Sequence, residues 1–221
     1  MKKKLIVTIS SIIVSCIALA VVIPFAILGV KTESVKNDYS YLKSDEIYNS
    51  KVEVLGIELV EQHVSCGYAT IEMMSAFYGD KVSEDDLDAR NKGGVSTSSS
   101  NGFLKEINKS ITSKTFVKRS YLKNDSLLKN IHDSLANNNP VALEWAAKYN
   151  DEWTLHFSLV SGMDLTNDEM TIYNPYGYIE KISVEEFIGR TTFESYKNIP
   201  LFLNFGFAYG AFEKNTIFYV K

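Results

Sequence analysis

The chain begins with a long apolar run. After Met1-Lys2-Lys3-Lys4, no charged side chain occurs from Leu5 to Val30, a stretch of 26 residues. A helix of about 20 apolar residues is long enough to cross the hydrocarbon core of a bilayer. We therefore expect residues 5–30 to form one transmembrane helix. Pro24 lies within it and is compatible with it, because proline is tolerated in such helices.

The charges beside this run predict its orientation. Three lysines precede it, whereas Lys31 and Lys36 on its far side are offset by Glu33 and Asp38. Because basic residues favour the cytoplasmic side, we expect a cytoplasmic N-terminus and an extracellular C-terminal domain on a single-pass cell-membrane protein. The alternative is a cleaved signal sequence that yields a secreted protein, although signal cores are usually shorter. We interpret residues 1–30 as an anchor.

Residues 31–50 are polar and show no helical stripe, so we expect a spacer between the anchor and one domain of residues 51–221. Val52 to Val60 alternates loosely in apolar residues and predicts a short strand. The next segment has visible helix boundaries, since Ser65 can cap a helix start and Gly79 can end one. The expected buried face of this helix consists of Ala69, Met73, Ala76 and Phe77.

The later part of the chain contains mainly strand patterns. Helices are expected at 103–110 and 125–136, and strands at 153–162, 170–173 and 216–220. The aromatic tail from Ile199 to Phe212 is too short to cross a bilayer, and we interpret it as strands that complete the sheet. A surface patch that rests on a membrane or a partner is the alternative. The pattern predicts an α+β fold, with an N-terminal helical part and a C-terminal, mainly antiparallel sheet.

Charge and composition exclude several function classes. The chain has 23 basic and 27 acidic side chains, but three lysines and no acid fall in the first thirty residues, which leaves 20 against 27, a charge of −7, for the rest. Such a domain repels phosphate backbones, so we expect no nucleic-acid partner. Three histidines and one cysteine outside the anchor cannot assemble a zinc site, and the Gly/Ser-rich loop 91–102 lacks P-loop spacing. We expect no metal, no cofactor and a monomer.

Cysteine usage singles out one thiol. Cys16 lies in the expected anchor, which leaves Cys66 alone in the outer domain and excludes a disulfide within it. Cys66 opens the predicted helix, where the positive end of the helix dipole favours thiolate over thiol and suits a nucleophile. A small buried residue at the start of a core helix is the alternative interpretation.

A nucleophilic cysteine needs a base, and the chain has three histidines. His63 is expected at the surface beside Cys66, and His132 on the wetter flank of its helix. His156 lies in an otherwise apolar strand, where its ring nitrogens need partners. Asn174 ends the next strand and can accept from one imidazole nitrogen, which leaves the other to face the thiol. A satisfied core histidine is the alternative for His156.

The order Cys66, His156, Asn174 resembles papain-like cysteine peptidases, and the local sequences are similar to their compact bacterial C39-like branch. The matching segments lie between about Val54 and Gly189 and include Gln62 with Ser65-Cys66-Gly67-Tyr68-Ala69, Asn139-Pro140-Val141-Ala142-Leu143, His156 to Asp164, Tyr173-Asn174-Pro175 and Ser183-Val184-Glu185-Glu186-Phe187. The resemblance implies a papain-like fold in which the loop 91–102 flanks the cleft.

The resemblance also implies a role for each matching residue. Cys66 is the nucleophile, and His156 is the general base and then acid. Asn174 is the orienting group, and Gln62 is an oxyanion-hole donor beside the Cys66 backbone N–H. The chain departs from the family pattern in two places: Gln62 stands four residues before the cysteine rather than five or six, and Asn174 replaces the usual aspartate.

The function indicated is thiol-dependent hydrolysis of a peptide or isopeptide amide, in a peptide or protein substrate, outside the membrane. The composition, rich in Lys, Asn and Ile and poor in Cys, is typical of a Gram-positive bacterial surface protein. Two alternatives stay open. One is an acyl or peptidyl transferase on the same scaffold, and the other is a catalytically inactive, membrane-anchored binding or immunity protein.

Overall fold

A seven-stranded sheet, antiparallel throughout, forms the centre of the domain. The computed structural model describes residues 2–221, with side chains from Ala18 onwards. In spatial order the strands are β2 (Phe116–Arg119), β7 (Thr216–Val220), β3 (Val141–Tyr149), β4 (Glu152–Asp164), β5 (Glu169–Asn174) and β6 (Tyr178–Ile182), and β1 (Val52–Glu53) pairs with β4.

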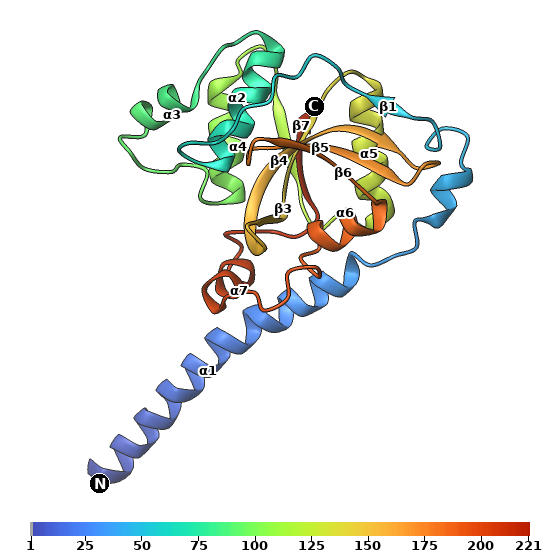
Figure 1. Ribbon diagram of the computed structural model, residues 1–221. Coiled ribbons are helices and arrows are strands. Elements are labelled where there is room, and N and C mark those ends of the chain that lie inside the picture. The colour runs from blue at the N-terminus through green and yellow to red at the C-terminus, as the bar shows by residue number, and fades with distance from the viewer. Residues whose placement is uncertain (1) are drawn as a thin grey trace.

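Helices cover the sheet in two groups. In Figure 1, α2, α3 and α4 lie on one side of the strands, and α5 and α6 lie on the other. Their bounds are Cys66–Tyr78 for α2, Glu84–Arg90 for α3, Ser100–Ser110 for α4, Asn124–Ala136 for α5 and Val184–Thr191 for α6. The largest apolar core fills the space between these helices and the sheet. The mixed helical and antiparallel architecture confirms the expected α+β class.

Helix α2 begins and ends where the sequence predicts. Ser65 accepts the backbone N–H of Tyr68 as N-cap, and Gly79 ends the helix with φ 85°. The predicted buried face is only half right, because Ala76 is exposed and Phe77 is half-buried. β4, α3 and α4 enclose the first turns from several sides. The buried residues are therefore Gly67, Tyr68, Ala69, Thr70, Ile71, Met73, Met74 and Ser75.

Two strand predictions are wrong. The strand expected from Val52 to Val60 is reduced to β1, and Gly56, with φ 82°, interrupts extended pairing soon after it. The tail expected as strands forms the helix α7 (Leu201–Ala208), which Pro200 precedes as N-cap residue. Proline fixes φ near the helical value and suits a helix start. The last expected strand is confirmed as β7.

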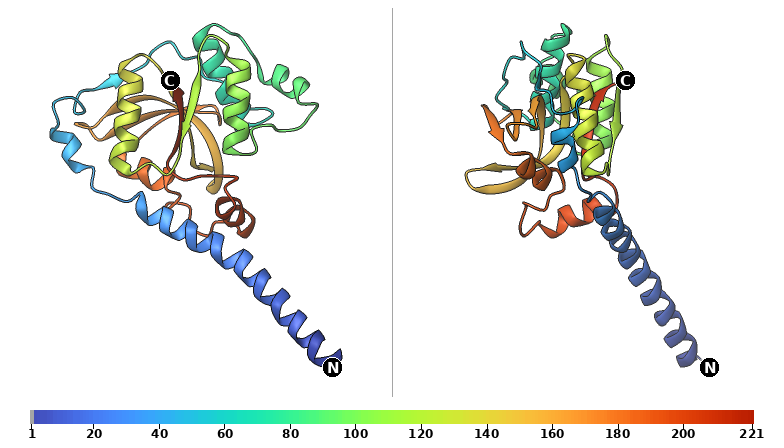
Figure 2. Two further views of the ribbon diagram at one scale, coloured as in Figure 1. Left: turned by 180° about the vertical axis from the view of Figure 1, so that it is seen from behind. Right: turned by 90° about the vertical axis from the view of Figure 1, so that its right-hand side faces the viewer.

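Helix α1 (Lys2–Ser34) projects away from the domain in both Figure 1 and Figure 2. Half of the transmembrane segment expected at residues 5–30 falls on residues 5–17, which lie outside the described side chains. In the part of the chain with described side chains, no helix is both long and apolar enough to cross a membrane.

Residues 31–50 are packed against the domain rather than forming a free spacer. A short 3-10 helix, η1 (Ser40–Ser44), follows α1, and the side chains of Val35 and Leu42 are fully buried. Ser50 Oγ lies 3.1 Å from Nε2 of His132. His132 is consequently buried and not on a wet flank, because the supposed spacer covers it.

Candidate active site

Cys66 opens α2 beside strand β4. Its sulfur lies near the backbone N–H of Phe157 in that strand. The Cys66 carbonyl accepts the hydroxyl of Thr70 at 2.8 Å, which secures the first turn of the helix. Gly67 allows the neighbouring loop to come close, because a Cβ atom there would collide with the side chain of Thr97. The helix start and the strand thus place a thiol against the sheet.

His156 is buried on β4, one residue before Phe157. Its Nε2 lies 2.9 Å from Oδ1 of Asn174. The ring of Tyr176 stacks on the imidazole with 4.1 Å between centroids, and the Tyr176 hydroxyl lies 2.7 Å from Oγ1 of Thr154. Stacking on one face and a hydrogen bond at one nitrogen hold the imidazole in a single orientation.

Hydrogen bonds fix which way the Asn174 amide points. Its Nδ2 donates to Oε1 of Glu180 at 2.8 Å and to the hydroxyl of Tyr178 at 3.3 Å, while its Oδ1 accepts the backbone N–H of Tyr176 at 3.0 Å. A carboxylate only accepts, so the amide nitrogen must face Glu180 and the amide oxygen must face His156. His156 therefore carries its proton on Nε2, and Nδ1 is the basic nitrogen.

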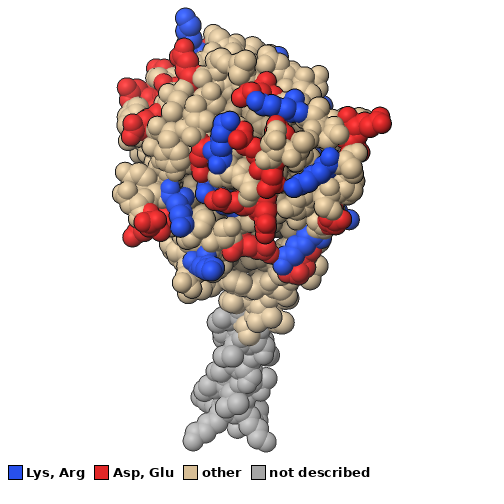
Figure 3. All heavy atoms as spheres, turned by 45° about the vertical axis from the view of Figure 1, so that its right-hand side comes forward, with Lys and Arg blue, Asp and Glu red and all other residues tan. Residues whose placement is uncertain are grey.

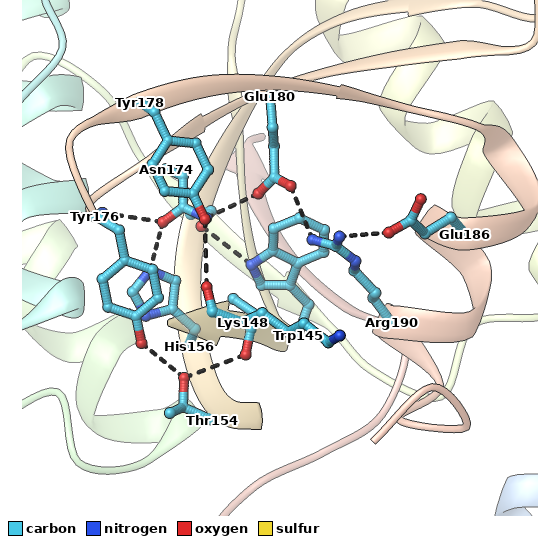
Figure 4. A network of polar contacts seen from close by, with 12 residues as sticks. Trp145, Lys148, Thr154, His156, Asn174, Tyr176, Tyr178, Glu180, Glu186 and Arg190 are labelled. Atoms are coloured by element: carbon cyan, nitrogen blue, oxygen red, sulfur yellow. Dashed lines mark hydrogen bonds and ion pairs between the residues drawn. The ribbon is translucent and has the colours of Figure 1, made fainter. Parts of the chain in front are cut away.

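Glu180 is a residue that the sequence analysis missed. Its second oxygen accepts from Arg190 at 2.9 Å, and Figure 4 shows Arg190, Glu180, Asn174 and His156 in one continuous row. Glu180 thereby directs a negative charge toward the imidazole through the amide of Asn174. The available signal is strand alternation: Tyr178 and Glu180 share one face of β6, and Tyr178 pairs with Asn174.

Burial favours the neutral form of both Cys66 and His156 in this structure. Burial raises the pKa of the Cys66 thiol to about 11, although nearby backbone N–H groups favour the thiolate. Burial also lowers the pKa of His156 to about 3, against the effect of its bond to Asn174. Desolvation thus opposes the thiolate that the helix start is expected to favour. Among the described residues, no hydrogen bond joins the sulfur to the imidazole.

A groove of about 380 Å³ leads to Cys66. Its walls are largely apolar and come from four parts of the chain: the start of α2, the loop before α4, strand β4, and the C-terminal segment around α7. The loop 91–102 thus flanks the groove, as the resemblance implied. The lining residues are Ser65, Cys66, Val95, Thr97, Ser98, Trp153, Thr154, Leu155, Phe157, Tyr196, Phe202, Leu203 and Phe212.

Gln62 lies next to the turn that follows Asn174. Its backbone N–H donates to the carbonyl of Pro175 at 2.7 Å, and its Oε1 is buried with no hydrogen-bond partner among the described residues. A buried amide oxygen without a partner is costly. The contacts therefore hold the backbone of Gln62 close to the orienting residue, while its side-chain oxygen makes no hydrogen bond with the site.

Glu84, a second residue that the sequence analysis missed, organises the loop before Cys66. Its side chain is fully buried. The Glu84 carboxylate accepts hydrogen bonds from three successive backbone N–H groups, which holds residues 63–65 in a compact turn. This turn is compatible with the short spacing between Gln62 and Cys66. The three donors are the backbone N–H groups of His63 at 3.1 Å, Val64 at 3.0 Å and Ser65 at 2.9 Å.

The other two histidines bind elsewhere. His63 is exposed, as expected, and its Nε2 lies 2.9 Å from a carboxylate oxygen of Asp85. His132 packs edge-on against Tyr48 and lies next to Ser50. His156 differs from both, because it precedes Phe157, the β4 residue that lies near the Cys66 sulfur.

Comparison with protein families identifies the class of this chain. Residues 54–200 match the model of the Peptidase_C39 like family. The match covers about two thirds of the chain, so the protein belongs to this family, and the resemblance seen in the sequence is confirmed at that level. No curated protein matches.

One similar solved structure is the crystal structure of a double glycine motif protease from an AMS/PCAT transporter in complex with the leader peptide. The identity is 16%, the TM-score is 0.48, and the alignment covers 76% of this chain and 93% of that one.

Proposed function

We propose that this protein is a thiol-dependent hydrolase of peptide amides that uses Cys66, His156 and Asn174. One observation carries the proposal: Nε2 of His156 is hydrogen-bonded to Asn174, which leaves Nδ1 free to act as a base, and the next residue, Phe157, lines the same groove as Cys66. Membership of a peptidase family agrees with this chemistry.

The neutral Cys66 thiol and His156 imidazole can begin the reaction by general-base catalysis. As the Cys66 sulfur attacks the substrate carbonyl carbon, its proton passes to Nδ1 of His156, and the carbonyl oxygen becomes an oxyanion. The backbone N–H of Cys66 lies in the first turn of α2, where no helical carbonyl takes it, and stabilises this oxyanion together with the amide of Gln62.

Collapse of the tetrahedral adduct breaks the amide bond. The imidazolium returns its proton to the leaving nitrogen, the amine departs, and a thioester remains on Cys66. His156 then takes a proton from water, the hydroxide attacks the thioester, and the acid product and the thiol are released. Glu180, acting through Asn174, stabilises the imidazolium that appears in both halves.

The site is proposed to face the outside of the cell membrane, with residues 5–30 as the anchor. The 26 uncharged residues and the lysines before them support this location.

A catalytically inactive binding module is the second candidate. Two observations favour it: burial raises the pKa of the Cys66 thiol to about 11, and the described contacts contain no hydrogen bond between Cys66 and His156.

Peptide cleavage by the full chain in lipid nanodiscs tests the proposal. Wild type and Cys66→Ala are incubated with a library of peptides, and products are identified by mass spectrometry, with and without an added amine. Cleavage by wild type alone supports the proposal, and a product that carries the amine identifies a transferase. Binding without any cleavage, equal in both forms, would establish the inactive module instead.

A further inference from the structure

Helix α7 is apolar on every side but only partly covered. Asn204 is its single polar residue. Leu203 and Phe207 pack into a small second core beneath the sheet. Leu201 and Phe202, in contrast, are 70% and 71% exposed. A helix that is apolar on all sides is normally buried on all sides. The exposed outer face of α7 is therefore expected to contact something outside the described chain.

The uncovered face continues onto α1. Phe205 packs edge-on against Phe25 with 5.3 Å between ring centroids, and the hydroxyl of Tyr209 donates to the carbonyl of Ala20 at 3.0 Å. Figures 1 and 2 show α7 beside α1 in each view. We use the term apolar collar for the exposed residues of these two helices: Leu19, Val21, Val22, Ile23, Ile27, Val30, Leu201, Phe202 and Tyr209.

Charged side chains border the apolar collar rather than interrupt it. Figure 3 shows an uncharged surface where α1 leaves the domain, with acidic and basic groups farther away on that face. Lys31 lies in the last turn of α1, and Nζ of Lys214 lies over the ring of Phe207 at 5.8 Å. Aromatic rings with lysines at their edge are typical of segments at the level of lipid headgroups.

We infer that the apolar collar is seated in the interfacial region of a lipid bilayer, with α7 inserted beside α1. A lipid surface is the occupant that fits, because the same exposed face is shared with the segment that enters the proposed anchor. The inference rests on that anchoring and adds a second contact to it. The family match ends at residue 200, one residue before α7, so this contact belongs to a part of the chain outside the matched segment.

Membrane seating of α7 has a consequence for the substrate. Phe202 and Leu203 also line the groove that leads to Cys66. The groove therefore opens at the bilayer surface, and the substrate class that it favours is a peptide lying on, or emerging from, a membrane.

Depth-dependent quenching tests the seating without any use of peptidase activity. The full chain carries Cys16→Ser and Cys66→Ser, and a single new cysteine receives an environment-sensitive fluorophore. The three probe variants are Phe202→Cys on α7, Ile23→Cys on α1 and the control Leu55→Cys. Leu55 is also strongly exposed, and its segment between β1 and α2 crosses the opposite end of the domain in Figures 1 and 2. Each variant is measured in phosphatidylcholine nanodiscs with ordinary or brominated acyl chains.

The inference predicts that brominated lipid removes most of the fluorescence at positions 202 and 23 and leaves position 55 unchanged. Quenching at 23 but not at 202 would overturn it while leaving the anchor in place. No quenching at either position would overturn the anchor as well. A blue-shifted probe at 202 that ignores bromination would show a protein cover, such as a second copy, and would also overturn it.

Discussion

An asparagine side chain has no charge with which to stabilise an imidazolium, so Asn174 depends on what lies behind it. Glu180 is hydrogen-bonded to the Asn174 amide nitrogen and paired with Arg190, and this arrangement sets both the amide orientation and the tautomer of His156. The orienting residue of this site is in effect an amide with a carboxylate behind it.

Replacing the Glu180 carboxylate tests whether it acts on His156 through Asn174. We expect Glu180→Gln to lower kcat by roughly 10- to 100-fold, because a hydrogen bond to a charged group is worth about 1.5–3 kcal/mol. The matched control is Glu186→Gln, which also contacts Arg190 but does not touch Asn174. Steady-state peptide cleavage measures both variants. Equal kcat in Glu180→Gln and wild type would remove Glu180 from the mechanism.

The hydrogen bonds that Glu84 accepts from the loop before Cys66 give a second prediction. Glu84→Gln offers one amide oxygen where the carboxylate accepts three N–H groups, so we expect slower cleavage and a less stable fold, by about 1–3 kcal/mol. Urea unfolding and kcat/KM are compared with those of Asp85→Ala, which removes only an exposed contact of His63. A Glu84→Gln enzyme as stable and active as the control would show that Glu84 does not hold this loop in place.

The candidate residues differ in how far the sequence could reveal them. Cys66 and His156 have local signals, namely a capped helix start and a polar position in an apolar strand. Glu180 has only the alternation of β6, which gives its face but not its partners, and Glu84 has no local signal, because the partners of both lie in other elements. Gln62 was predicted as an oxyanion donor by resemblance, and its role remains part of the proposal.

Among the elements, α2 was predictable because residues at both of its ends signal a helix start and stop. The tail that forms α7 lacks such clear signals and was predicted wrongly. Ser65 and Gly79 delimit α2 from either side. In the helix α7 every residue except Asn204 is apolar or glycine, so neither a period of two nor one of 3.6 stands out. Pro200 was available as a start signal, but the tail was interpreted as strands because it is too short to cross a bilayer.

The contact between α2 and the loop before α4 can be tested at Gly67. We expect Gly67→Ala to destabilise the fold by about 1–3 kcal/mol and to slow cleavage, because the new Cβ atom collides with Thr97 and displaces the start of α2. Adding Thr97→Gly removes the collision and should restore much of both. Thermal unfolding and kcat/KM provide the readouts, and a double variant no better than Gly67→Ala would refute this explanation.

At the scale of the whole molecule, a buried acid joins the helical part to the sheet. Glu144 of β3 is fully buried and accepts the hydroxyl of Ser100 at the start of α4, and its other oxygen has no partner among the described residues. Burial raises the pKa of Glu144 to about 8. The folded chain therefore keeps a proton that the unfolded chain releases above about pH 4.5.

The pH dependence of stability follows from this proton. The stability linked to Glu144 is fully present below about pH 4.5 and is lost as pH rises toward 8. We expect Glu144→Gln to raise the free energy of unfolding over wild type by roughly 3 kcal/mol at pH 7, with a smaller difference as pH falls. Urea unfolding across this range measures it, with the exposed Glu46→Gln as control. A pH-independent difference would contradict the assignment.

Covalent trapping of Cys66 tests whether His156 is its base. A peptidyl electrophile is mixed with wild type and with His156→Ala, and the rate of labelling at Cys66 is followed by intact mass from pH 5 to 11. We expect single labelling of wild type at neutral pH. We expect labelling of His156→Ala to be slower by on the order of 100-fold, with a rate that recovers only as pH approaches the thiol pKa of about 11. Equal rates in the two proteins at neutral pH would contradict this role of His156.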